Sequence, residues 1–541
     1  MRRIYIIVLL MGLLAVALLS HKRFDLTADK RYTLAPATIK LLNSVREPVH
    51  IEVYLKGSFP SYFRKLSEET QMLLQQFHHI NSKITFDFTD PLKSNLSGKL
   101  QREGMIPAEI TVRKGNELTG ITVFPWAVIF IGDESVQVPL LVDIPGIGVE
   151  EQINRSIEQL EYAFAYRFSE LLVKEKPAVA ILKGNGELPD VYLASFLTAL
   201  RDFYRLAPFT LDSIKVNPQR TLEQLKQFDL VIVAKPTEKF SPEEKFTLDQ
   251  YLMNGGKLLL LIDPVKAHKD TLMYRHRTYA LNAELDLTDW LFGYGVRLEP
   301  VLVKDWQAAP VTLKVGQVGK NPQLQSFPWY YSPLVIPEQD NPIGKNTGKI
   351  KLDFVSIIDT LPGGPPKTVL LKSSPHTEII GVPVQINFSE IARKPDPARF
   401  NAGEKIFGIL LEGQFKSAYA GRVKPFDIST KDSAKTKMIL IADGDIIKND
   451  VGRNGPIPLG YDRYSRMTFD NLSFLLNAVH YLTDKSGLFL LKTKEVRPAL
   501  IDKNRAVAEG GFWQWFGFLL PLLLVSFPVI MYQYLRKKHY A

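Results

Sequence analysis

The chain has 541 residues, of which 45% are hydrophobic and 11% aromatic, a composition typical of several folded domains and not of a disordered protein. It has no cysteine, which excludes thiol nucleophiles, disulfide bonds, zinc thiolate sites and iron–sulfur clusters. The formal net charge is +10, but no nucleic-acid partner is indicated, because the middle of the chain nowhere combines clustered Lys and Arg with interleaved aromatic residues.

An apolar segment lies at each end of the chain. Residues 4–20 predict a transmembrane helix, with a cleaved signal peptide as the alternative. Residues 512–535 predict a second one, since they have no formal charge and carry Trp and Tyr at their two ends. Three basic residues, 536–538, follow this segment and by the positive-inside rule place the C-terminus in the cytoplasm. The predicted location is the cell inner membrane, with two passes, both termini cytoplasmic and a large periplasmic domain at about 24–505.

Residues 24–174 are predicted to form an N-terminal α/β domain. Residues 49–55 alternate as a strand does, residues 58–80 have helical periodicity, and residues 83–90 form another strand. Two more strand-like runs follow this βαβ unit, and then a long amphipathic helix at about 150–173. The order of elements is thioredoxin-like, but a domain without cysteine cannot perform thiol redox chemistry.

Residues 177–500 are predicted to form a flavodoxin-like α/β domain. Its runs at 178–182, 230–234 and 258–262 are almost continuously apolar, which indicates strands buried on both faces. Such strands form a parallel sheet with helices on each side.

The helix before the third of these strands has a clear beginning, because Ser241 and Glu244 have the spacing of a capping box. A region rich in Pro and Gly, at about 309–435, is predicted to be loops and short strands inserted into the domain. After it the pattern predicts a buried strand at 437–443, a helix at 469–482 and a strand at 488–491.

The common catalytic and cofactor motifs fail. The nearest match to a P-loop, residues 344–350, is one residue too short and has Ile350 where Ser or Thr would reach magnesium. The Gly-x-Gly runs lack the third glycine of a dinucleotide fingerprint, and no serine lies in a nucleophile elbow. No histidine pair has metal-ligand spacing supported by an acid. We therefore predict no enzyme, no cofactor and no catalytic or metal-binding residue.

Polar side chains follow several of the predicted strands. In a doubly wound sheet, ligands bind beyond the carboxyl ends of the strands. The residues that would gather there are Asn185, Glu187, Asp263, Asp443 and Asp445. They predict a ligand crevice, with the alternative that they only cap turns.

Short segments along essentially the whole chain match a known family. They are residues 25–34, 47–55, 184–187, 294–296, 413–419, 442–445 and 470–481. With these segments the chain resembles the GldG type of gliding-motility-associated auxiliary subunit of an ABC transporter. The resemblance implies a periplasmic body that acts with a polytopic permease and a separate cytoplasmic ATPase in Bacteroidetes-type bacteria. The family commonly has Gly-His-Gly-Glu where this chain has Asn185, so a ligand held by that histidine would not be held here.

The second domain is also similar to the glutamine-amidotransferase-like folds of sugar-binding proteins. The amidotransferase nucleophile is a cysteine, which this chain lacks, so the similarity implies binding or scaffolding.

Three functions compete on the sequence. The first is a non-catalytic extracytoplasmic subunit of an ABC transporter linked to gliding motility, with a permease, an ATPase and membrane lipids as partners. The second is a membrane-anchored carbohydrate-binding module of the envelope, with a polysaccharide or an envelope protein as partner. The third is a hydrolase that uses the acidic strand ends. The aromatic residues 329–331 fit core packing, a protein interface or a sugar platform.

Overall fold

The computed structural model describes residues 33–114, 117–142, 144, 147–172, 175–318, 321–494 and 503–540. They belong to two compact units. One spans residues 32–494 and holds every strand among the described residues, and the other contains helix α12 (Lys503–Tyr540).

The structure corrects the predicted membrane topology. Within the described residues, no helix has both the length and the apolar character needed to cross a membrane. Helix α12 includes the second predicted span, 512–535, but extends through charged sequence beyond both ends of that apolar run. Polar and proline residues also interrupt the run, at Gln514, Pro521, Ser526 and Pro528. The first predicted span, 4–20, lies outside the described residues.

The described residues therefore form a mixed α/β fold, and the structure supports neither of the two predicted transmembrane helices among them. The predicted two-pass inner-membrane location, with cytoplasmic termini and a periplasmic domain, rested on those helices and is not supported by the described residues. The absence of formal charge at 512–535 led the sequence prediction to overestimate how apolar the whole helix is.

A four-stranded sheet forms the first part of the 32–494 unit, with the strand order β2-β1-β5-β6. Strand β1 pairs in parallel with β2 and antiparallel with β5, and β5 pairs antiparallel with β6. The bounds are β1 (Val49–Val53), β2 (Ile84–Phe88), β5 (Trp126–Ile131) and β6 (Glu134–Pro139). A βαβ unit at its beginning agrees with the sequence pattern, although the predicted domain boundary at residue 174 stays a prediction.

Helices pack on this sheet through one apolar core. Ile51 of β1, Phe77 of the following helix and Phe164 of the long helix are all fully buried in it. The helices of this core are α2 (Pro36–Ser44), α3 (Ser61–Ile80) and α5 (Val149–Leu172). Helix α4 (Ser97–Arg102) packs through Leu100 in a separate cluster, and a hairpin is formed by β3 (Ala108–Lys114) and β4 (Glu117–Val123).

A seven-stranded sheet forms the centre of the unit, with the order β19-β22-β23-β10-β9-β7-β8. Its strands are β7 (Ala178–Lys183), β8 (Arg205–Thr210), β9 (Leu230–Ala234), β10 (Leu258–Leu261), β19 (Lys367–Lys372), β22 (Ile406–Lys416) and β23 (Ser433–Ile441). The strands from β8 to β23 are all parallel, and in chain order they have the 2-1-3-4-5 arrangement of flavodoxin-like sheets. Strands β22 and β19 extend the sheet antiparallel at one edge.

Each face of this sheet has its own apolar core because successive strand residues point to opposite sides. Val179, Ile232 and Ile439 pack under α6 (Asp190–Arg201) and α11 (Asn471–Thr483). Ala180, Val231 and Leu440 pack under α7 (Pro218–Leu225), α8 (Pro242–Met253) and α10 (Thr288–Gly293). Helix α8 begins with the predicted capping box: Ser241 and Glu244 each bond to the other's backbone N–H.

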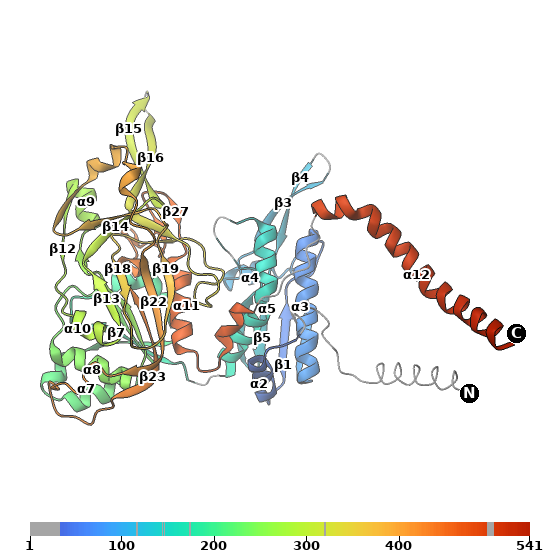
Figure 1. Cartoon of the computed structure of the whole chain (residues 1–541), viewed down its shortest axis with the longest axis horizontal. Coiled ribbons are helices and arrows are strands. Elements are labelled where there is room, and N and C mark those ends of the chain that lie inside the picture. The colour runs from blue at the N-terminus through green and yellow to red at the C-terminus, as the bar shows by residue number, and fades with distance from the viewer. Residues whose placement is uncertain are drawn as a thin grey trace. The chain divides into compact units, whose positions relative to one another are not determined.

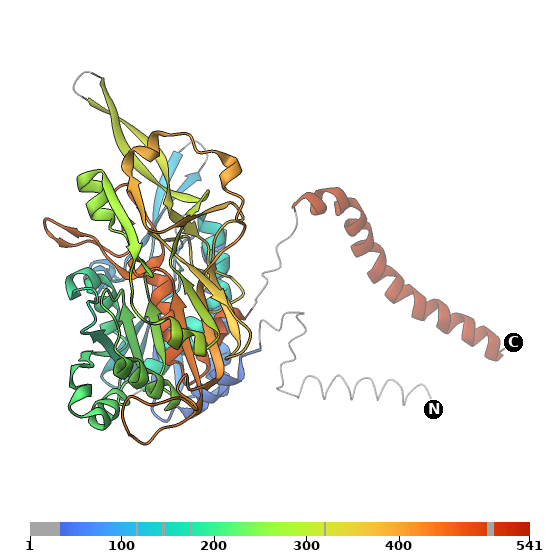
Figure 2. The same ribbon diagram turned by 60° about the vertical axis from the view of Figure 1, so that its left-hand side comes forward.

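The segment between β10 and β23 contains more regular structure than the sequence predicted. Its longest element is the hairpin of β15 (Ala308–Val318) and β16 (Asn321–Val335), which projects from the rest of its unit in both views (Figures 1 and 2). The smaller elements are β11 (Val265–Lys266), α9 (Lys269–Arg275), β12 (Arg277–Asn282), β13 (Val296–Glu299), β14 (Val301–Asp305), β17 (Ile350–Lys351), β18 (Ile357–Thr360), β20 (Thr377–Gly381), β21 (Val384–Asn387), and the 3-10 helices η2 (Phe388–Ala392) and η3 (Pro397–Arg399).

The predicted strand at 488–491 is wrong, since these residues lie in the 3-10 helix η5 (Leu488–Thr493). Gly487 has a φ of 77°, and the carboxylate of Asp484 accepts backbone N–H bonds from Gly487 and Phe489. These bonds wind the chain into a turn where an extended strand was expected.

The remaining short elements are η1 (Asp212–Lys215), η4 (Asp445–Ile447), β24 (Val451–Gly452), β25 (Gly455–Pro456), β26 (Tyr461–Asp462) and β27 (Met467–Thr468).

Candidate functional site

Charged side chains gather where the parallel strands end. Lys235 follows β9, Asp263 follows the end of β10 closely, and Asp445 comes shortly after β23. The Nζ atom of Lys235 lies 2.9 Å from Oδ2 of Asp263 and 2.5 Å from Oδ1 of Asp445. The side chain of each of the three is about nine-tenths buried. The backbone N–H of Gly444 also donates to Asp263, so the loop after β23 is held against the end of β10.

Asp443 lies behind this triad and is fully buried. Its Oδ1 atom accepts the N–H of Asp445 at 2.7 Å and its Oδ2 atom accepts the N–H of Asp353 at 2.8 Å. Burial, and then the nearby carboxylates of Asp263 and Asp445, raise the pKa of Asp443 well above its usual range. Burial acts to lower the pKa of Lys235, but its two carboxylate partners raise it above the usual value. The two carboxylates therefore favour the charged form of the Lys235 ammonium.

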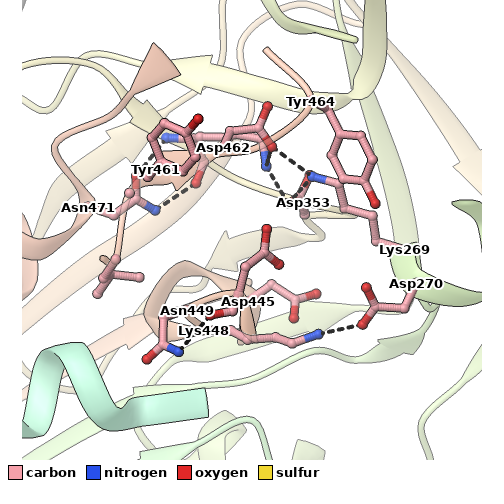
Figure 3. Close-up of a pocket in the computed structure, with 14 residues that line it drawn as sticks. Lys269, Asp270, Asp353, Asp445, Lys448, Asn449, Tyr461, Asp462, Tyr464 and Asn471 are labelled. Carbon is pink, nitrogen blue, oxygen red and sulfur yellow. Dashed lines mark hydrogen bonds and ion pairs between the residues drawn. The ribbon is translucent and has the colours of Figure 1, made fainter. Parts of the chain in front are cut away.

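A polar pocket opens beside the cluster (Figure 3). The space in it that water can reach is about 60 Å³. Lys269 lies 3.1 Å from a carboxylate oxygen of Asp353 and 3.4 Å from one of Asp462. Lys351 lies 2.5 Å from the same Asp353 oxygen and 3.6 Å from Asp462. Asp445 also lines this pocket, so the pocket adjoins the charged cluster at the strand ends.

The lysines keep the two pocket carboxylates ionised. Burial acts to raise the pKa of Asp353, but Lys269 and Lys351 lower it below its usual range. They lower the pKa of Asp462 in the same way. In return, Asp353 and Asp462 raise the pKa of Lys269 against the effect of burial.

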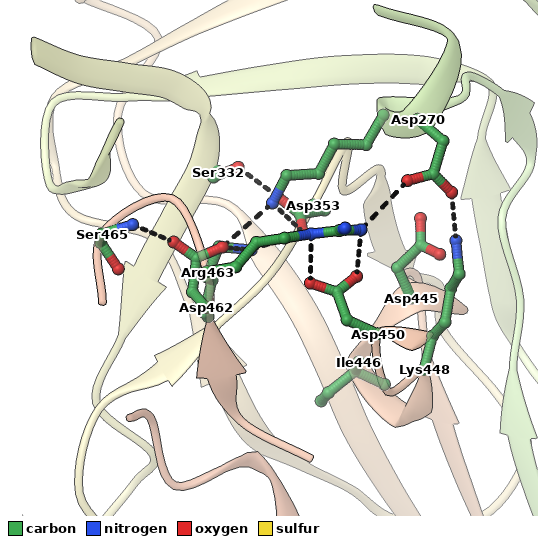
Figure 4. A network of polar contacts seen from close by, with 12 residues as sticks. Asp270, Ser332, Asp353, Asp445, Ile446, Lys448, Asp450, Asp462, Arg463 and Ser465 are labelled. Carbon is green, nitrogen blue, oxygen red and sulfur yellow. Dashed lines mark hydrogen bonds and ion pairs between the residues drawn. The ribbon is translucent and has the colours of Figure 1, made fainter. Parts of the chain in front are cut away.

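A second set of ion pairs surrounds the pocket mouth (Figure 4). Lys448 lies 3.2 Å from Asp270, and Arg463 lies 3.0 Å from Asp450 and 3.7 Å from Asp270. Anionic and cationic groups thus alternate from the strand ends to the mouth. Within the described residues, no cluster of three His, Asp or Glu side chains is placed to hold a metal ion. Paired charges of both signs suit a polar ligand that carries many hydrogen-bonding groups and little net charge.

The structure divides the five predicted crevice residues into two groups. Asp263, Asp443 and Asp445 come together at the strand ends. Asn185 and Glu187 bond to each other, since the N–H of Asn185 donates to Oε2 of Glu187 at 2.8 Å. Neither of these two lines the pocket. That these residues bind a ligand stays a prediction.

Sequence reasoning missed the lysines and the residues of the insertion. Lys235 could have been found, because it follows a buried strand as directly as the predicted aspartates do. Lys351 and Asp353 come from a region predicted as loops, and Asp462 comes from the short strand β26, so only the folded chain brings them to the strand ends.

A family model described as "ABC-type uncharacterized transport system" matches residues 176–478, more than half of the chain. The chain belongs to this family. The matched region contains the strand-end cluster and every residue that lines the pocket. A second model, described as a domain of unknown function, matches residues 28–130.

Membership in the ABC-type transport system family shows an auxiliary protein associated with transporter components, and it suggests a non-catalytic role. No curated protein matches the chain. A solved structure titled "mmIFT52 N-terminal domain" is 12% identical, with 57% of this chain and 97% of that chain covered. Its TM-score of 0.32 is too low to support an argument from that likeness.

Proposed function

We propose that this protein is a non-catalytic auxiliary subunit of an ABC transporter, that it acts with a membrane permease and a separate ATPase, and that its strand-end pocket binds a polar ligand. The observation that carries the proposal is the family match over residues 176–478, which includes the whole pocket. The resemblance of further segments to the GldG type supports a transporter linked to gliding motility.

The geometry favours binding over hydrolysis at this pocket. A hydrolase that used the acidic strand ends would need a free carboxylate and a proton donor directed at the substrate. Asp445 is held in an ion pair with Lys235, and both oxygens of Asp443 accept backbone N–H bonds. These carboxyl groups are therefore engaged in holding the loops, and the pocket offers fixed donors and acceptors instead.

Purification of the tagged full-length chain from its native cells, in mild detergent, tests the partners. We expect a permease and an ATPase to co-purify in fixed proportion, and ATP hydrolysis to follow the ATPase chain. The protein expressed alone should hydrolyse no ATP. Recovery of the chain without either partner, with gliding and transport unchanged after deletion of its gene, would refute the proposal and favour an independent carbohydrate-binding module.

A further inference from the structure

A second pocket lies at the base of the long β15–β16 hairpin. It has a volume of about 1230 Å³, including open solvent, and it shares no lining residue with the strand-end pocket. Four consecutive residues of β16, 328–331, line one side, and residues near η2 and η3 line the other. Three of those four β16 residues are aromatic, so the pocket has a partly aromatic wall.

The aromatic wall continues onto an exposed tryptophan. Strand alternation buries Trp329 and Tyr331 in the core and leaves Tyr330 only partly buried. The ring of Trp306 packs beside that of Tyr330, with centroids 5.7 Å apart and planes at 33°. It also meets the edge of Phe400 at 5.0 Å, yet 41% of Trp306 remains exposed. A fixed, exposed aromatic ring of this kind offers a flat apolar surface to a ligand.

Two of the three acidic residues of the pocket are paired with a cation. Glu390 pairs with Lys304 at 3.0 Å, and Glu378 pairs with Arg399. Asp396 accepts the N–H of Ala398 at 3.0 Å and so caps the short helix η3.

Two basic residues of the same pocket have no such engagement. Arg393 and Lys394 line it, are exposed, and form no ion pair with any other part of the chain that the structure describes. The cationic groups left for a ligand therefore outnumber the anionic ones. Arg393 in particular can hold a carboxylate through two parallel hydrogen bonds.

We propose that this pocket binds an acidic oligosaccharide built from hexuronate units. The flat face of one sugar ring packs on Trp306 and Tyr330, and the carboxylate pairs with Arg393 and Lys394. This site is separate from the strand-end pocket and does not depend on the transporter partners.

Calorimetric titration of the full-length protein with trigalacturonate tests the proposal. Binding should be detected, and maltotriose, which lacks carboxylates, should bind at least tenfold more weakly. Trp306→Ala should weaken trigalacturonate binding about tenfold or more, because the sugar ring loses the aromatic face on which it packs. Trp306→Phe should restore most of it. Arg393→Gln should weaken binding and reduce its dependence on salt.

Two variants outside the pocket serve as matched controls. Tyr274→Ala removes an aromatic residue that is 89% exposed, and Arg453→Gln removes an exposed basic one. Both should bind trigalacturonate as the wild type does. The proposal fails if trigalacturonate does not bind, if maltotriose or a polyglutamate peptide binds equally well, or if Trp306→Ala and Arg393→Gln bind like the two controls.

Discussion

Replacing Lys492 by Met should stabilise the protein at neutral pH. Lys492 lies in η5, is 8% exposed, and its ammonium donates to Oδ1 of Asn477 at 2.8 Å. The rings of Phe489 and Tyr162 lie 5.2 Å and 5.5 Å from its Nζ atom. Burial lowers the pKa of Lys492 to about 7, with Asp470 acting weakly in the opposite direction.

The sign of the pH dependence follows from this lowered pKa. In the unfolded chain a lysine has a pKa of about 10.4, so between about pH 7 and pH 10 the unfolded state binds one more proton than the folded state. The free energy of unfolding should therefore rise with pH by about 1.4 kcal/mol per unit across this range.

Methionine keeps the apolar part of the side chain and removes the titrating ammonium. At pH 7 the lowered pKa of the buried lysine costs the wild type about 4 kcal/mol of unfolding free energy, which the variant avoids. The variant loses one hydrogen bond worth about 1 kcal/mol, so we expect its free energy of unfolding to be higher by about 3 kcal/mol. Near pH 10 the gain should vanish or reverse.

Urea unfolding of the full-length protein from pH 7 to pH 10, followed by tryptophan fluorescence, measures the difference. Lys494→Met is the matched control, because Lys494 lies two residues away but pairs with Glu161 at 2.6 Å. This control should destabilise the protein throughout the range. The reasoning is refuted if Lys492→Met brings no stabilisation at pH 7, or if its difference from wild type does not change with pH.

Three further changes test other features. Lys235→Met leaves two buried carboxylates without their cation and should lower the free energy of unfolding by about 3–5 kcal/mol in urea titrations; an unchanged midpoint would contradict this. Gly363 and Gly364 have φ values of 90° and 69°, but only at Gly364 would an added Cβ overlap the backbone of Tyr294. Gly364→Ala should therefore lower the melting temperature far more than Gly363→Ala. Burial lowers the pKa of His480 to about 3. As the pH falls from about 6.5 to 3, the free energy of unfolding of the wild type should therefore decrease relative to that of His480→Gln by about 1.4 kcal/mol per pH unit. Parallel curves of unfolding free energy against pH would argue against a buried neutral imidazole.

Local patterns in the sequence were sufficient for the buried parallel strands. The apolar run at residues 230–234 coincides with β9, because a strand covered on both faces has no polar alternation to obscure it. The same short-run signal failed at 488–491, where an apolar run of four residues fits a strand or a turn of helix equally well. The turn bonds to Asp484 decided between the two.

The pocket could be predicted only in part. Asp263, Asp443 and Asp445 each follow a parallel strand, so their gathering follows from topology alone. Asp353 and Asp462 reach the same place through long-range folding of the segments before and after β23, which no local periodicity records. Ion pairing between segments distant in sequence is a property of the tertiary structure.

The position of β23 in the sheet has a consequence for how the chain folds during synthesis. Residue 258 of β10 pairs with residue 438 of β23, while the strands on the other side of β10 come from earlier in the chain. The free edge of β10 therefore stays unpaired until the ribosome has made the chain through β23, which ends at residue 441. A nascent or truncated chain that ends before β23 exposes an unpaired apolar strand, which is a template for aggregation.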